Sequence, residues 1–294
     1  MSDSFVNKPV GALCAAVLAF FILAPVFPAK AQMPGSPPGQ MGTGIPNQTG
    51  VGAGGAMNDQ LAYGTFGHEV MREEDSAYQA FLKERDPAKR IKLGNDFLQR
   101  YPKSPLAEQV DVGIMNIYRA QQDWKNTYLW ADHALALQPD DVDVLTTVGW
   151  TIPHVYTPDD PDADQELDKA EKYSKHAIEV LLNLPKPPKM SSEDFTAAKA
   201  KRSCQAHSAL GLVYFRRDDY ENSAKELQQA TRGNPAPDPT DLFVLGGDLQ
   251  NLKRYDEAAA QFTACGQIAG ALQSQCQQNA GKMKVLADAT ESNK

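Results

Sequence analysis

Residues 207–214 read His-Ser-Ala-Leu-Gly-Leu-Val-Tyr, and Tyr220, Ser223, Leu227, Ala230 and Pro235 follow at fixed distances. The pattern returns 35 residues later, where Leu210-Gly211 becomes Leu245-Gly246, Tyr220 becomes Tyr255, Leu227 becomes Phe262 and Ala230 becomes Cys265. The separations of 6 and 15 residues between Tyr214, Tyr220 and Pro235 also recur between Tyr118, Trp124 and Pro139. Self-similarity at such a period indicates an array of short structural repeats.

Each repeat is predicted to be a pair of short helices. Small residues stand where two helices must approach closely: Gly149, Gly211 and Gly246 in the first helix, and Ala170, Ser223 and Ala258 in the second. Pro139 and Pro235 end the second helix, because proline cannot continue it. One such hairpin cannot bury its own apolar stripe, so the units must stack.

The motif resembles the tetratricopeptide repeat, with its W-x-x-L-G-x-x-Y…A-x-x-x-F…P pattern, over roughly residues 70–286. This resemblance implies an all-α fold, an α-solenoid of antiparallel helix hairpins with a C-terminal capping helix. The solenoid is expected over residues 66–290. Its expected parts are a divergent pair at 73–102, repeats at about 108–141, 142–203, 204–238 and 239–270, and a cap at 271–287.

The second repeat is interrupted by two inserts. Gly149 and Gly211 are 62 residues apart, which is one period of 35 plus 27 extra residues. Nine of these fall between the two helices and 18 follow them. The second insert contains Leu184-Pro-Lys-Pro-Pro-Lys189 and is predicted to be a proline-rich loop that leads into a helix beginning near Ser192.

The N-terminus has the features of an export signal. Lys8 precedes an apolar run that Pro25 ends, and Ala29 and Ala31 give the A-x-A pattern of a signal-peptidase site. We therefore predict a signal peptide over residues 1–31, with an uncleaved membrane anchor as the alternative. Residues 32–65, rich in Gly and Pro, are predicted to be a flexible linker. Cleavage would leave no stable membrane span and would place the protein in the periplasm or outside the cell.

The composition and motifs argue against nucleic-acid binding and against catalysis. The formal net charge is −8 and the pI is about 5.2, so there is no bulk basic footprint for nucleic acid. His68-Glu69 begins like a zinc-protease helix, but Arg72 stands where the second histidine belongs. The sequence contains no nucleophile elbow, P-loop or dinucleotide fingerprint. We expect neither an enzyme nor a cofactor.

The first insert has the carboxylate spacing of a calcium loop. Counted from Asp160, the acids Asp160, Asp162, Asp164 and Glu171 fall at ligand places of an EF-hand loop. Place 6, where the sharp turn needs glycine, is Gln165. The other interpretation is an acidic loop whose Asp164 caps the following helix.

Two cysteines are placed to close the C-terminal end. Cys265 and Cys276 are 11 residues apart, on the last second helix and at the start of the cap. A disulfide would join the cap to the last repeat; the alternative is that both are small buried residues. Cys204 has no partner nearby in the sequence.

The resemblance implies that the first helices line a concave groove that binds protein or extended peptide. The groove positions that are not expected to pack in the hydrophobic core include aromatic and arginine side chains, which are typical of anchor surfaces. These candidates are Asn116, Arg119, Thr146, Trp150, Ser208, Phe215, Arg216, Phe243 and Gln250. Some members of this family bind a peptide carboxylate with a set of Lys, Asn and Arg residues. Only Asn116 matches this set here, so the resemblance does not imply carboxylate binding.

Three functions are compatible with these features. The first is an exported scaffold that binds a protein or peptide without catalysis. The second is an assembly factor of the envelope that acts on cell-wall polymer or on secretion machinery; residues 97–109, FLQRYPKSPLAEQ, resemble repeat edges of periplasmic assembly proteins. The third is an accessory domain regulated by calcium at the first insert.

Overall fold

The computed structural model describes residues 73–292, which fall within one compact unit, Thr65–Lys294. The predicted signal peptide and linker lie outside the described residues. Helices fill most of this part and no strand occurs in it. After a helical segment at 73–83 come α3 (Pro87–Arg100), α4 (Ala107–Ala120), α5 (Trp124–Leu137), α6 (Val142–Val155), α7 (Ala163–Asn183), α8 (Ser192–Arg216), α9 (Tyr220–Thr231), α10 (Pro239–Asn251), α11 (Tyr255–Gly266) and α12 (Gln273–Glu291). Within residues 73–292, no helix combines the length and the apolar character needed to cross a membrane.

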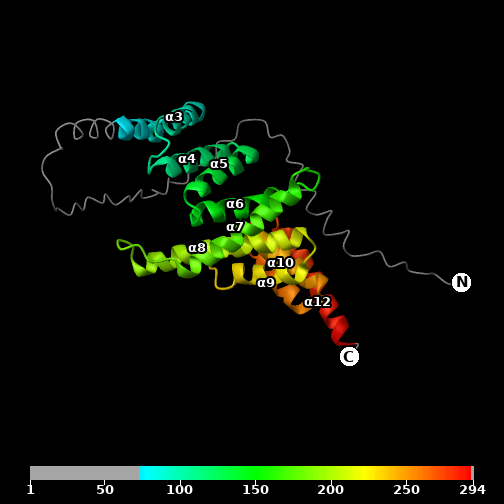
Figure 1. The fold of residues 1–294 in the computed structure, drawn as a ribbon. Coiled ribbons are helices and arrows are strands. Elements are labelled where there is room, and N and C mark those ends of the chain that lie inside the picture. Colours follow the sequence, from blue (N-terminus) through cyan, green and yellow to red (C-terminus); the bar gives the residue numbers. More distant parts are fainter. Residues whose placement is uncertain (1–72, 293–294) are drawn as a thin grey trace, which may run out of the picture. The chain divides into compact units, whose positions relative to one another are not determined.

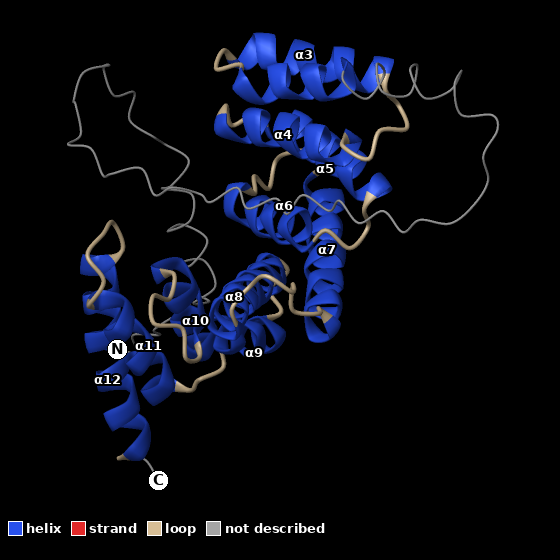
Figure 2. Cartoon of the chain, turned by 90° about the vertical axis from the view of Figure 1, so that its left-hand side faces the viewer, coloured by secondary structure: helices blue, strands red, loops and turns tan. Residues whose placement is uncertain are grey.

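Successive helices pack as hairpins. The pairs are α4 with α5, α6 with α7, α8 with α9, and α10 with α11, and α12 packs on α11. The first helices of neighbouring hairpins also touch, since α8 contacts both α6 and α10. Figures 1 and 2 show the hairpins following one another along the chain. The predicted all-α solenoid of antiparallel hairpins is confirmed for the described residues.

The glycines of the first helices permit the closest approach within a hairpin. A Cβ atom placed on Gly211 would lie 2.5 Å from Leu227 Cγ, and one on Gly246 would lie 2.8 Å from Phe262 Cε1. Leu227 and Phe262 are the equivalent large residues of α9 and α11. Each of these two hairpins therefore packs its large residue against the glycine of the facing helix.

Three hairpins share one tight turn. Gln122, Asp218 and Lys253 have φ values of 59°, 58° and 60°. The next residue in each turn donates its backbone N–H to the carbonyl five positions earlier, as from Asp219 to Tyr214 at 3.0 Å. This is the closure expected where a residue in the left-handed region ends a helix. Each turn thus needs only three residues between its helices.

The two inserts change the length of helices as well as loops. The first insert gives the connection 156–162 and lengthens α7 to 21 residues. The second gives the loop 184–191, after which α8 begins at Ser192 and runs for 25 residues, against 14 in α4 and 13 in α10. Ser191 caps this extended helix by accepting from the Asp194 N–H at 3.0 Å. Much of the second insert is therefore an N-terminal extension of a first helix.

The C-terminal end is closed by α12. Its buried residues Cys276, Ala280, Met283 and Ala287 recur at helical spacing and form the face that meets the last repeat. Cys276 forms a disulfide with Cys265, and their Cα atoms are 5.7 Å apart. The thiol of Cys204 is free, and burial is the main reason that its pKa is raised.

Candidate partner-binding surfaces

We call the exposed and half-buried residues of α4, α6, α8 and α10 that were candidates for the groove the first-helix face. Asn116 and Arg119 on α4 are exposed. Trp150, Phe215, Phe243 and Gln250, on the three later first helices, are half-buried. Phe215 and Phe243 pack against one apolar cluster, which also holds Leu245 and Phe262. The aromatic residues are thus partly anchored in the core and partly open to solvent.

Two candidates were wrong because neighbouring residues cover them. Ser208 is buried, and its hydroxyl donates to Asp241 Oδ1 at 2.7 Å across the contact between α8 and α10. Thr146 is buried and donates to the Val142 carbonyl at 2.7 Å. Burial is also the main cause that raises the pKa of Asp241 to about 7. The Ser208–Asp241 bond joins α8 to α10, whereas the Thr146 bond lies within α6, and neither hydroxyl is open to a partner.

Arg216 is used mainly inside the molecule. Its Nε and Nη2 atoms donate to the Pro153 carbonyl at 3.3 and 3.0 Å, and its guanidinium lies over the Tyr156 ring at 5.2 Å. The last carbonyls of a helix lack partners within that helix, so Arg216 caps α6 from α8. Burial lowers the pKa of Arg216. Its first role is therefore to join two successive first helices.

Trp150 is held in one orientation by His154. The two rings stack with centroids 3.7 Å apart, and His154 Nδ1 lies 2.7 Å from the Trp150 carbonyl oxygen. Burial lowers the pKa of His154, which favours the neutral ring donating from Nδ1. Trp150 therefore presents a fixed aromatic edge on the first-helix face.

A pocket of about 490 Å³ lies beside Asn116, between α3 and α4. It is lined by Pro87, Arg90, Gly113, Asn116, Ile117, Ala120 and Gln121. The Arg90 guanidinium lies over the Phe81 ring at 4.8 Å, and its Nε is buried without a hydrogen-bond partner among the described residues. Asn116 Nδ2 donates to the Val112 carbonyl at 2.9 Å, which leaves its amide oxygen to accept from a ligand. We call this the α3–α4 pocket.

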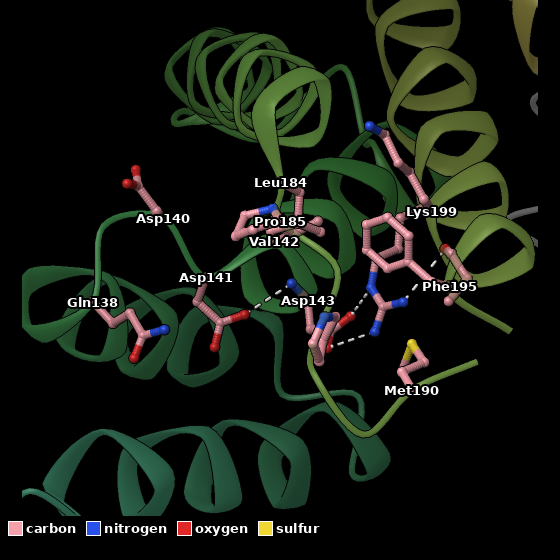
Figure 3. Close-up of a pocket in the computed structure, with 13 residues that line it drawn as sticks. Gln138, Asp140, Asp141, Val142, Asp143, Leu184, Pro185, Met190, Phe195 and Lys199 are labelled. Carbon is pink, nitrogen blue, oxygen red and sulfur yellow. Dashed lines mark hydrogen bonds and ion pairs between the residues drawn. The ribbon is translucent and has the colours of Figure 1, made fainter. Parts of the chain in front are cut away.

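A second pocket, of about 310 Å³, is built by the second insert (Figure 3). We call it the insert pocket. Its apolar lining comes from the loop 184–191, from α8 and from the start of α6: Val142, Leu184, Pro185, Pro187, Met190, Phe195 and Ala198. Its polar lining residues are Gln138, Asp140, Asp141, Asp143, Lys199 and Arg202.

The charged side chains of the insert pocket are divided between two walls. Asp140 and Asp141 lie on the side of the α5–α6 loop, and Lys199 lies on the α8 side (Figure 3). Arg202 is already paired, since its Nη2 donates to Asp143 Oδ2 at 2.9 Å. Asp141 caps α6 by accepting from the Val144 N–H at 3.0 Å. The N-terminus of α6 is thereby fixed at the pocket's edge.

Solved structures with similar folds include repeat proteins of known type. A thermophilic TPR protein of Thermus thermophilus is 15% identical, with 73% of this chain and 98% of that one covered and a TM-score of 0.41. PilW, described as a widely conserved type IV pilus biogenesis factor, is 14% identical, with coverage of 76% and 90% and a TM-score of 0.48. A tetratricopeptide repeat protein of Parabacteroides merdae is 11% identical, with coverage of 72% and 98% and a TM-score of 0.30. No family model and no curated protein matches the chain.

The chain's own packing identifies the repeat. Its helices pack as successive hairpins, the last two hairpins are 35 residues apart, and in each of these two the glycine of the first helix lies against the large residue of the second. The fold is a tetratricopeptide-repeat solenoid. Within that solenoid, the α3–α4 pocket shares Asn116 with the first-helix face, whereas one wall of the insert pocket is formed by residues that the regular repeat does not have.

The carboxylates of the first insert do not form the calcium loop that their spacing suggested. Because α7 begins at Ala163, Asp164 and Glu171 lie on a helix, while Asp160 and Asp162 precede it. Glu171 pairs with Lys175 and Arg217, and Asp168 pairs with Arg217 at 2.5 Å. Across residues 73–292, no group of three or more His, Cys, Asp and Glu side chains is placed to hold a metal ion. The expected cap at Asp164 is also wrong, because the residue before the helix is Asp162.

Sequence reasoning did not find Arg90 or the insert pocket. Arg90 belongs to the divergent first unit, where the repeat motif gives no register. The insert pocket combines residues up to 64 positions apart, from Gln138 to Arg202. The proline-rich stretch itself was the available signal, because prolines in a loop restrict its conformations and favour a preformed surface.

Proposed function

We propose that this protein is an exported, non-catalytic scaffold that binds a protein or an extended peptide along its first-helix face. The α3–α4 pocket carries the proposal. The Arg90 guanidinium lines this pocket, its Nε has no hydrogen-bond partner among the described residues, and hydrogen bonds from a guanidinium are charge-assisted. An extended peptide offers carbonyl oxygens to Arg90 and N–H groups to the Asn116 amide oxygen.

The rest of the face supplies contacts suited to a long ligand. Trp150, Phe215 and Phe243 present partly open aromatic rings on three successive first helices. Such rings bury a large area with few rotatable bonds, which is why they act as interface anchors.

The proposed export depends on the signal peptide predicted over residues 1–31. Determining the first residue of the mature protein tests whether this peptide is cleaved. We expect the exported protein to begin at Gln32, as determined by N-terminal sequencing of material from the periplasm or medium. A chain that keeps residue 1 and stays in the membrane fraction would contradict cleavage and support the anchor.

Site-specific cross-linking tests the surface. A photoreactive residue at Asn116 should give a discrete adduct with a protein partner in an envelope fraction, identified by mass spectrometry. The same residue at Lys125, which is exposed on α5, is the matched control. Equal adducts from both positions would contradict binding at this face. Capture of cell-wall polymer in place of protein would favour the envelope-assembly function.

The Arg90→Met variant tests whether the Arg90 guanidinium binds the partner. Methionine keeps an apolar stem beside Phe81 but has no N–H group to donate. We expect the Asn116 adduct to fall at least about fivefold, in line with the loss of one charge-assisted hydrogen bond. An unchanged adduct yield would show that Arg90 does not contact the partner.

A further inference from the structure

The insert pocket is an apolar surface outside the regular repeat. Met190 is 37% exposed at its edge, and Leu182, close to the start of the same loop, is 72% exposed. Pro185 and Pro187 restrict the loop that forms one wall. The apolar lining residues gather around one hollow and are rimmed by polar side chains. A wall already restricted by prolines also loses less conformational entropy when a ligand binds.

The wall opposite α8 carries an excess of negative charge. Asp140 is exposed and contacts His176 Nε2 at 2.8 Å. Behind it, the carboxyls of Glu108 and Asp141 lie close together, with Asp111 nearby. Burial first, and then Asp141, raise the pKa of Glu108 to about 7. Carboxylates this crowded are relieved by a proton or by a cation from outside.

The cationic residues of the pocket do not neutralise this wall. Arg202 is committed to Asp143 through two hydrogen bonds. Lys199 lies on the other side of the pocket and donates to the Leu182 carbonyl at 3.3 Å. The pocket therefore has an apolar floor and one acidic edge that faces solvent. An anionic ligand such as a nucleic acid or an acidic membrane would be repelled from that edge.

We propose that the insert pocket is a second docking site, which receives an apolar side chain of a partner peptide that carries a lysine or arginine beside it. The apolar side chain lies among Leu184, Met190 and Phe195, and the cation lies against Asp140 and Asp141. The volume of about 310 Å³ is at the lower end of the range of roughly 300–1,000 Å³ for small-ligand sites. It therefore suits one or two side chains of a short segment. This site is separate from the first-helix face and does not depend on the function proposed for that face.

Two labelled peptides test the proposal on the full-length protein. Each is a fluorescein-labelled dodecapeptide of Gly and Ser with two leucines, flanked either by lysines or by glutamates. Fluorescence anisotropy at low ionic strength should show the lysine peptide binding at least about tenfold more tightly than the glutamate peptide. The preference should shrink at high salt, because the ionic contact is exposed to screening.

Variants locate the binding. Met190→Asp should weaken the lysine peptide roughly tenfold by placing a charge at the apolar edge, and Asp140→Asn should weaken it about threefold while leaving the leucine contact in place. Leu129→Asp is the matched control, because Leu129 is an exposed leucine on α5 that does not line the pocket; its binding should equal that of the wild type.

Three results would overturn the proposal. The first is equal affinity for the two peptides, and the second is unchanged binding by Met190→Asp when its circular dichroism spectrum is native. The third is a concentration-dependent dimer that Met190→Asp dissociates in analytical ultracentrifugation, since the occupant would then be a second copy of the chain. None of these outcomes changes the result of photo-cross-linking at Asn116. A failure of the insert-pocket proposal can therefore be distinguished from a failure of the function proposed for the first-helix face.

Discussion

At the scale of single residues, α10 contains two adjacent glycines in opposite environments. A Cβ atom on Gly246 would meet three atoms of the Phe262 ring at 2.8–2.9 Å, whereas one on Gly247 would meet nothing within 4 Å. We predict that Gly246→Ala lowers the unfolding free energy by about 1–3 kcal/mol through overpacking. Gly247→Ala should raise it by up to about 1 kcal/mol, because alanine is the better helix former. Urea denaturation monitored by circular dichroism checks both, and a loss of stability in both variants would contradict the packing described for α10.

Asp248 makes stability depend on pH. Its carboxyl is fully buried, and the Ser223 hydroxyl lies 2.6 Å from Asp248 Oδ2 and 2.8 Å from the Gly211 carbonyl oxygen. A hydroxyl has one hydrogen, so both contacts are satisfied together only when Asp248 donates its own proton. Burial, opposed by the Ser223 hydrogen bond, raises the pKa of Asp248 to about 8.

The sign of the pH effect follows from that proton. The unfolded chain releases it near pH 4, whereas the folded protein keeps it to about pH 8, so the stabilisation is complete below pH 4 and is lost as the pH rises to 8. We predict that the unfolding free energy of the wild type falls by roughly 1–3 kcal/mol more than that of Asp248→Asn between pH 5 and 8.5. Asp256→Asn, on the exposed side of α11, should behave as the wild type. Parallel pH profiles for the wild type and Asp248→Asn would show that this proton is not held.

At the scale of elements, the turn that joins α10 to α11 contains a lysine in the left-handed region. Lys253 has a φ of 60°, a conformation that costs a residue with a Cβ atom about 1 kcal/mol. We predict that Lys253→Gly raises the melting temperature, with a gain of up to about 1 kcal/mol. Lys253→Ala, which removes the charge but keeps the Cβ atom, should give no such gain. Equal shifts in the two variants would attribute the effect to charge.

The disulfide fixes α12 to the last repeat. The bond between Cys265 and Cys276 closes a loop of 11 residues, which in the chain-entropy model contributes up to about 3 kcal/mol. We predict that Cys276→Ala lowers the melting temperature and increases hydrogen exchange in α12 more than in α4–α7. Cys204→Ala leaves the disulfide intact and is the control.

The sequence specified the helices better than the surface between them. Gly211 and Gly246 place the last two hairpins, because the close approach of their helices depends on those residues. Ser208 and Arg216 occupy groove positions in the motif, yet Asp241 and the Pro153 carbonyl engage them. Those two partners depend on how α6, α8 and α10 meet, which a motif within one repeat does not encode. The predicted calcium loop is absent for a related reason, since α7 begins at Ala163 and takes up all but the first three of its twelve places.

At the scale of the whole solenoid, the core is divided along the chain. One buried cluster joins Phe81, Phe97 and Ile114 at the N-terminal end, and another joins Leu227, Leu245 and Phe262 at the C-terminal end. Each repeat contacts mainly its neighbours, so stability is local. We predict that Phe262→Ala, at a cost of about 3–5 kcal/mol, increases hydrogen exchange in α10–α12 and leaves α4 and α5 protected. Phe97→Ala should do the reverse. Uniform loss of protection in either variant would indicate a single cooperative unit.

The length of α8 gives the two proposed surfaces a common mechanical element. This helix carries Phe195 and Lys199 at the insert pocket, and 25 residues span about 37 Å to Arg216, which holds the end of α6. A ligand that immobilises the first turns of α8 also restricts its last turns, so a second ligand at the far end has less motion left to suppress. The two occupants would then bind cooperatively. Each must change the affinity of the other by the same factor, and titration of either ligand in the presence of the other measures it.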